Sequence, residues 1–140
     1  MKDVVVGSSS DFALSNLTKG KTPRLPFLLL KRRVLGKRYA LSLVFAGDAV
    51  TQKLNRTYRK KTYVPNVLSF PLDTTFGEIF LNLTQAKREH RARGESLDFY
   101  IALLFVHALY HLKGVHHGSR MEMLEKRALR AASIDNTLGA

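Results

Sequence analysis

Residues 97–117 read LDFYIALLFVHALYHLKGVHH, and this stretch decides what kind of fold the chain can form. Its first half is apolar nearly all round, which is typical of a helix buried in the middle of a domain rather than lying on its surface. Ser96 can cap the amino end of this helix. Gly114 can end it, because glycine tolerates the left-handed conformation that reverses the chain. The stretch therefore predicts a central helix with the rest of a domain packed around it.

The flanking sequence predicts shorter elements on either side. Apolar or β-branched runs indicate strands at 2–6, 39–45, 67–70 and 77–83, the last two as a hairpin. Apolar residues at helical spacing indicate a helix at 49–58, an apolar run that begins near Pro26 indicates one at 26–35, and a basic helix is expected at 84–93. Asp48 and Thr84 are expected as N-caps, Pro26 in a first turn, and Gly94 after a last turn. The 140 residues, 45% of them hydrophobic, can bury one core, so we expect residues 1–140 to form a single domain.

Net charge is the strongest signal in the composition. The chain has 23 Lys and Arg against 11 Asp and Glu, which gives a net charge of +12. The cations lie mainly in the clusters 31–33, 37–38, 59–61 and 87–88, with Arg91 and Arg93. Such a balance favours a polyanionic partner, RNA or DNA, although a solvated basic surface would give the same count.

Cysteine is absent, so a disulfide framework and a thiolate metal site are both excluded. Any metal must be held by histidines and carboxylates, and a reducing cytosol suits this composition. The three valines at 4–6 are too short a run for a signal-peptide core. The longest apolar stretch, 97–106, falls short of the roughly 20 residues that a membrane-spanning helix needs. We therefore expect a cytoplasmic protein with no membrane partner.

Four of the five histidines fall within residues 107–117. His107 and His111 are four residues apart, so on a helix they share one face and can present two imidazole nitrogens to one ion. The chain reversal at Gly114 could then bring back His116 or His117 as a third ligand. Three protein ligands leave one position open, which distinguishes a catalytic metal site from a closed structural one. The alternative is that these are ordinary helix histidines.

The spacing H-x3-H-x2-G-x2-H also matches that of metzincin proteases, apart from the glutamate that follows their first histidine. Here that position is Ala108. A peptidase without this glutamate lacks the base that activates water, unless a carboxylate such as Glu78 takes its place. We therefore rank a peptidase below an enzyme that cleaves RNA.

Three blocks of sequence resemble the YbeY family of bacterial-type endoribonucleases. The family's histidine motif, H-G-x-L-H-L-x-G-Y-D-H, is similar to 107–117, with matches that include His107, His111 and His117. The family's block L-N-x-x-Y-R-x-K, followed by T-D-V-L-S-F-P, is similar to 54–61 and 65–71, with Asn66 in place of the aspartate. The family's G-D-I strand resembles 77–79, and 121–125 resembles its closing helix.

This resemblance, which extends from about residue 40 to about residue 130, implies both a fold and an activity. The expected fold is α+β, a mixed sheet of about four strands packed with about five helices, with the metal site on the central buried helix. The resemblance implies zinc on His107, His111 and His117, and cleavage of single-stranded RNA. It also implies a role in maturation of ribosomal RNA, of the 16S-type 3′ end, and in ribosome quality control, with proteins of the small ribosomal subunit as partners.

The resemblance further implies a catalytic role for Arg59, whose guanidinium can hold two phosphate oxygens in a fixed fork. Arg59, Lys60 and Lys61 are expected to bind RNA, the two lysines through phosphates regardless of sequence. We expect His116 to face solvent beside His117, and Asn66 to slow catalysis relative to the family's aspartate.

Two alternatives remain from the sequence alone. Phe70, Phe76 and Phe80 could stack on bases, but aromatic residues on strands are more often core, and we expect them there. The alternative to an RNA-cleaving enzyme is a non-enzymatic factor that binds ribosomal RNA or the ribosome, with the histidines as a structural zinc site. The net charge supports both equally.

Overall fold

The computed structural model describes residues 5–136, which form five strands and five helices. In chain order these are β1 (Val5–Ser9), β2 (Phe12–Asn16), α1 (Phe27–Leu35), β3 (Ala40–Ala46), α2 (Asp48–Arg59), β4 (Val67–Asp73), β5 (Phe76–Asn82), α3 (Leu83–Glu89), α4 (Leu97–Lys113) and α5 (Ser119–Ala131). The expected α+β fold with a mixed sheet, five helices and the histidines on a central helix is confirmed.

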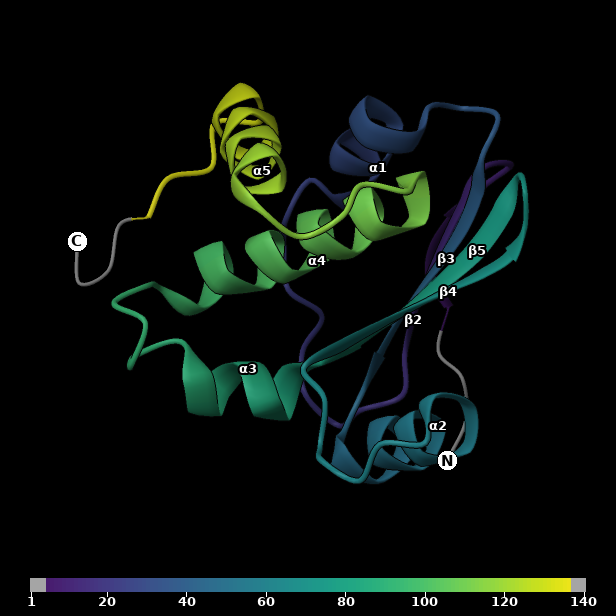
Figure 1. Ribbon diagram of the computed structural model, residues 1–140, viewed down its shortest axis with the longest axis vertical. Coiled ribbons are helices and arrows are strands. Elements are labelled where there is room, and N and C mark those ends of the chain that lie inside the picture. The colour runs from purple at the N-terminus through teal and green to yellow at the C-terminus, as the bar shows by residue number, and fades with distance from the viewer. Residues whose placement is uncertain (1–4, 137–140) are drawn as a thin grey trace.

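The sheet has the strand order β1-β2-β3-β5-β4, so β4 is an edge strand. Strand β3 runs parallel to both β2 and β5, whereas β1 and β4 run antiparallel to their neighbours (Figure 1). The sheet has one strand more than the four or so expected, because β2 was not identified from the sequence. Its burial alternates strictly, with Phe12, Leu14 and Asn16 buried, so its period of two was the available signal.

The hydrophobic core lies between one face of the sheet and the helices α1, α4 and α5 (Figure 1). Alternate residues of β3 and β5 point into it, because successive side chains of a strand face opposite sides. Leu43, Phe45, Ile79 and Leu81 are the best buried of these. Helix α4 contacts α1, α3, α5 and the strands β4 and β5, so the helix that decides the fold is indeed its centre.

Helix α2 packs against β4 and β5 from the other face of the sheet, apart from α1, α4 and α5 (Figure 1). Asn82 follows the core residue Leu81 and faces the opposite side of the sheet, where it joins the end of β5 to α2. Its amide nitrogen donates to the side-chain oxygens of Asp48 and Thr51 at 2.9 and 3.0 Å. The sheet therefore separates α2 from α1, α4 and α5.

Pro26 is the N-cap residue of α1 rather than part of its first turn, and α2 ends at Arg59 rather than at Tyr58. Three further helix boundaries differ from those expected from the sequence. Gly47, not Asp48, is the N-cap residue of α2, and Asp48 is its first helical residue, where its carboxylate pairs with Arg88. Asn82, not Thr84, caps α3, because its side chain accepts a hydrogen bond from the backbone N–H of Gln85.

The third difference is that α3 ends at Glu89 rather than at Arg93, and turns lead through Gly94 to α4. Of the strand expected at 2–6, residues 2–4 lie outside the described part of the chain. Within the basic cluster 31–33, Lys31 is fully buried and donates to Asp11 at 2.8 Å. Lys31 therefore belongs to the packing of the fold and not to a basic surface.

The expectation that Phe70, Phe76 and Phe80 belong to the core is wrong. All three lie outside the core cluster; Phe70 and Phe80 are half-buried, and Phe76 is 42% exposed. Phe70 and Phe80 belong to the sheet face that carries α2, which covers that face only in part. None of the helices within residues 5–136 is both long enough and apolar enough to span a membrane.

Candidate metal centre

Helix α4 positions two of the three predicted ligands. It begins as expected at Ser96, whose side-chain oxygen accepts a hydrogen bond from the N–H of Phe99 at 3.2 Å. It ends at Gly114, which has φ of 95° and so turns the chain in the left-handed conformation. The intervening helix is buried on most sides, so the half-buried rings of His107 and His111 have a rigid base.

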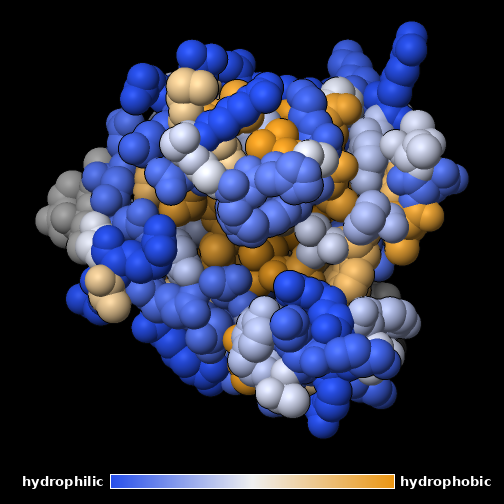
Figure 2. Space-filling model, in the orientation of Figure 1, coloured by the Kyte–Doolittle hydropathy of each residue, from blue (hydrophilic) through white to orange (hydrophobic). Residues whose placement is uncertain are grey.

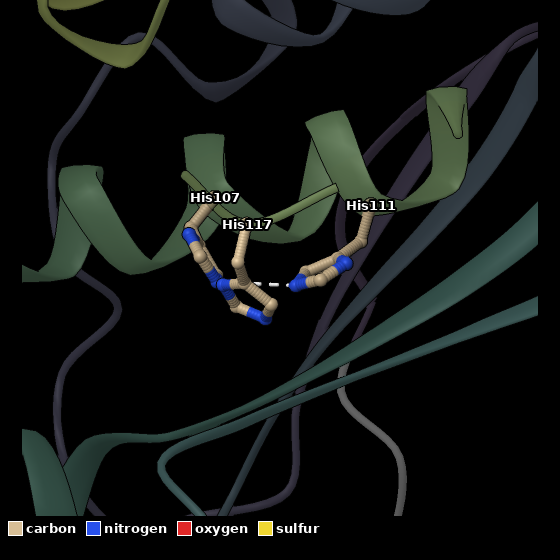
Figure 3. Close-up of side chains that lie close together, drawn as sticks. All are labelled: His107, His111 and His117. Carbon is tan, nitrogen blue, oxygen red and sulfur yellow. Dashed lines mark hydrogen bonds between the residues drawn. The ribbon is translucent and has the colours of Figure 1, made fainter. Parts of the chain in front are cut away.

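The turn after Gly114 brings His117 back to the other two histidines. One nitrogen of each ring lies within 4.8 Å of the others, so the three donors form a cluster that can hold a metal ion. All three rings point toward a common space beside α4 (Figure 3). His116 is exposed and lies outside this cluster, in keeping with its expected orientation to solvent.

The spacing of the donors fits a tetrahedral ion. Two nitrogens bound at the usual zinc distance of about 2.0–2.1 Å are separated by about 3.3 Å in tetrahedral geometry. The Nε2 atoms of His107 and His111 are 3.1 Å apart. His107 and His111 are therefore spaced like two ligands of one ion, and a nitrogen of the exposed His117 lies within 4.8 Å of both.

A carboxylate that sequence reasoning missed contacts this cluster. Glu125 of α5 is 6% exposed, and its Oε2 atom lies 2.5 Å from Nδ1 of His107. This contact leaves Nε2 of the ring for the cluster and fixes the direction of the ring. The sequence held a signal for Glu125, since it lies on the apolar face of an amphipathic helix with Met121 and Leu129.

The pKa of His111 is lowered below its ordinary value. Burial is the largest cause, followed by the neighbouring rings of His107 and His117. A lowered pKa favours the neutral ring, which is the form that binds metal. The positive charge of Arg59 lowers the pKa of His111 further.

Arg59 is the last residue of α2. Lys60 follows it with φ of 57° as the C-cap, and Lys61 begins the loop to β4; all three side chains are exposed. Arg59 forms no ion pair with any residue between 5 and 136, so its guanidinium is free for another anion. The charge of Arg59 acts on His111, although the two residues come from different parts of the chain.

A groove of about 790 Å³ opens beside His107 and His117 and runs along α4 and α5. Its apolar walls include Leu103, Leu104 and Leu129. Figure 2 shows apolar surface at the bottom of a hollow in the middle of this face of the molecule, bordered by hydrophilic side chains. A substrate that approaches the cluster therefore has a surface to lie against.

Asn66 lies in the wall of this groove and is held by a polar network. Its amide donates to Oε1 of Glu89 at 3.0 Å, and the hydroxyl of Tyr100 donates to the same oxygen at 2.6 Å. Although burial acts to raise the pKa of Glu89, these hydrogen bonds and one from Gln85 lower it below its ordinary value. Burial raises the pKa of Tyr100 to about 12, and the neighbouring Glu89 adds to this shift.

The carboxylate that a peptidase would need is not supplied by Glu78. Glu78 alternates along β5 with the core residue Ile79, so it points to the face opposite α4, where Ser42 donates a hydrogen bond to it. The carboxylate near the cluster is Glu125, and it is already engaged with His107. Neither Glu78 nor Glu125 is therefore a free base for peptide hydrolysis at this site.

The fold and the site together define a class, that of small α+β domains with a three-histidine site that can hold a metal ion. A family model described as Endoribonuclease YbeY matches residues 16–136. The endoribonuclease YbeY of Onion yellows phytoplasma is 34% identical over 119 residues, which make up 79% of this chain and 78% of that protein. That of Helicobacter pylori strain J99 is 37% identical over 97 residues, 65% of this chain and 69% of that protein.

The chain therefore belongs to the endoribonuclease YbeY family, as its resemblance to that family predicted. A solution structure of a Thermotoga maritima protein has the same fold, with a TM-score of 0.60 over 85% of this chain and 88% of that one. At 19% identity, this likeness concerns the fold alone.

Proposed function

We propose that the protein is a zinc-dependent endoribonuclease that cleaves single-stranded RNA. The observation that carries this proposal is the convergence of His107, His111 and His117, with a groove that opens beside His107 and His117. The family's name supports RNA as the substrate. Three imidazoles without a thiolate suit zinc, although other divalent transition metals accept the same ligands.

Each part of the site has a role in this chemistry. A zinc ion on three imidazoles would supply Lewis acidity at its fourth, open position. Glu125 holds the ring of His107 so that Nε2 faces the cluster. Arg59 would bind two oxygens of the phosphodiester and stabilise the negative charge that develops there during cleavage. Lys60 and Lys61 would contact neighbouring phosphates and hold the strand in place.

We further propose that the substrate is ribosomal RNA, matured at the 16S-type 3′ end in the cytoplasm, with a further role in ribosome quality control. Proteins of the small ribosomal subunit are the proposed partners. The net charge of +12 supports a polyanionic substrate of this kind, and so does the resemblance to the family.

The number of ligands favours an enzyme over a binding factor with a structural zinc site. Structural zinc sites are closed by four protein ligands. Among residues 5–136 the cluster has three such ligands, and the nearby Glu125 contacts a ring nitrogen of His107. The fourth position of an ion held by these ligands would be open to substrate.

The test is cleavage of an end-labelled single-stranded RNA by protein whose zinc content has been measured. We expect cleavage by the zinc-loaded protein, little cleavage after chelation, and recovery when zinc is added back. The duplex form of the same RNA should resist. Arg59→Ala should lower kcat while the protein keeps its zinc, and Arg59→Lys should recover only part of kcat, since a lysine lacks the planar fork.

Arg56→Ala is the matched control, because Arg56 is also exposed in the last turn of α2 and has no proposed role at the metal. Cleavage that persists after both chelation and Arg59→Ala would point to a contaminating nuclease. RNA that is bound but never cut would instead establish the binding factor.

A further inference from the structure

Three aromatic rings form a continuous row on the sheet face that carries α2. The ring of Tyr58 lies 5.7 Å from that of Phe70, and Phe70 lies 6.1 Å from Phe80, both in edge-to-face geometry. We call these three residues the aromatic row. It joins the last turn of α2 to the edge strand β4 and its neighbour β5.

The register of the hairpin explains the row. Phe70 pairs with Glu78 across the two strands, and Phe80 is two residues further along β5. Side chains two residues apart on a strand share a face, so Phe70 and Phe80 are diagonal neighbours within reach of each other. Tyr58 extends the row from the helix that packs on the same face.

Tyr58 is the open end of the row. Its side chain is 68% exposed, the largest exposed fraction among the large hydrophobic side chains of the described residues, although its ring contacts Phe70. An edge-to-face contact occupies at most one face of a ring, so Tyr58 keeps a face toward solvent. A ring held by a neighbour but open on one side is suited to stacking on a planar group.

The surroundings of Tyr58 are strongly basic. Between Asp48 and Asp73 the chain has no acidic residue. In the same interval it has five cations, Lys53, Arg56, Arg59, Lys60 and Lys61. All five are exposed, and none forms an ion pair within the described range of 5–136. Glu78 is the acid nearest the row by register. Burial raises its pKa, which favours the uncharged form of its carboxyl group.

The aromatic row is also continuous with Arg59 through the chain. Arg59 follows Tyr58 directly in the chain and is the residue proposed above to bind the phosphodiester. A strand whose base stacks on Tyr58 would therefore have a phosphate near Arg59. Stacking requires an unpaired base, which a duplex does not offer.

We propose that the aromatic row is the binding surface for single-stranded RNA, with a base stacked on Tyr58 and the adjoining phosphates on Arg59, Lys60 and Lys61. The inference rests on the proposed function for the identity of the strand. It adds to that function a surface that selects a single strand over a duplex, because stacking on Tyr58 requires an unpaired base. It predicts recognition by ring faces, which tolerates any base sequence.

The test is binding of a fluorescently labelled, 2′-O-methylated single strand to the zinc-loaded protein, followed by anisotropy, with a gel to show that the strand stays intact. Tyr58→Ala should weaken binding about fivefold to a hundredfold, the range for loss of one stacked base. Tyr58→Phe should bind like the original protein, because it keeps the ring. Tyr63→Ala is the control, since Tyr63 is 53% exposed but lies outside the row.

Two further measurements separate stacking from charge. A strand of the same length without bases should bind the original protein and Tyr58→Ala equally. The dependence of affinity on salt should have the same slope in Tyr58→Ala as in the original protein, whereas Lys60→Ala should reduce that slope by about 0.7, the value for one phosphate of a single strand.

Equal affinity of Tyr58→Ala and the original protein for the base-containing strand would overturn the inference, and so would an equal loss on both strands. Binding that depends on Tyr58 in a protein that never cuts RNA would contradict the proposed function alone. Normal cleavage with binding indifferent to Tyr58→Ala would contradict this inference alone.

Discussion

Glu125 and His107 are joined across two helices, with Oε2 of the carboxylate 2.5 Å from Nδ1 of the ring. The carboxylate comes from α5 and the ring from α4, so the packing of these helices sets the orientation of one metal ligand. Partners of this kind, behind a metal-binding histidine, fix the ring and raise its basicity as a ligand.

Glu125→Gln should therefore weaken zinc binding about 10- to 100-fold, the range found when such a partner is removed. A chelator competition with a metal-sensitive dye measures this without reference to activity. Glu122→Gln is the matched control, because Glu122 is exposed on the same helix, three residues earlier. Equal zinc affinity in Glu125→Gln and Glu122→Gln would contradict the role given to Glu125.

Removal of single histidines should separate ligands from bystanders. We expect His111→Ala to lose bound zinc and RNA cleavage together, while circular dichroism shows that the fold survives. His116→Ala should keep both zinc and cleavage, because His116 is exposed and lies outside the cluster. Unchanged zinc content in His111→Ala, measured by mass spectrometry, would refute this assignment.

Asn66 stands where the family's motif has aspartate, and its environment explains why an amide suits this chain. Its nitrogen lies 3.0 Å from Oε1 of Glu89, an atom that accepts and cannot donate when ionised. Asn66→Asp would place two carboxylates together, and we expect a loss of about 1–3 kcal/mol in the free energy of unfolding at neutral pH, measured with urea. Adding Glu89→Gln should restore most of it; a double variant as unstable as the single one would exclude repulsion as the cause.

The lowered pKa of Glu89 predicts a dependence of stability on pH. Because this pKa is lower in the folded protein than in the unfolded chain, the stabilisation is fully present above the ordinary value of 4.5. It should be lost as the pH falls below 4.5 through the lower, folded pKa. In zinc-free protein, Glu89→Gln should thus be less stable than the original at pH 6 and approach it at pH 3. Parallel stability curves for the two proteins from pH 3 to 7 would contradict the shift.

The central helix and its histidines were predictable because their signals are local. Ser96 and Gly114 mark the two ends of α4 by their own chemistry, and the helical repeat alone places His107 and His111 on one face. The third ligand was predicted through the resemblance to a family motif, since the path of the chain after Gly114 depends on how α5 packs.

What the sequence did not reveal depends on contacts between distant segments. Asn82 caps α3 because β5 ends one residue earlier than expected, and that boundary is set by pairing with β3 and β4. Phe70 and Phe80 alternate correctly along their strands, but nothing in that alternation tells which face α2 leaves partly open. The contact between Glu125 and His107 likewise needs two helices to be packed before it can be seen.

The burial of α4 limits how this family member can change in evolution. Ala108 is 1% exposed and packs in the core, although it follows the first ligand directly. A glutamate there, the residue that would complete a peptidase motif, would bring an ionisable group into apolar surroundings, which is costly. We therefore expect a single mutation of Ala108 toward the peptidase motif to impair folding of this chain, so the helix that builds the core also restricts the chemistry of its metal site.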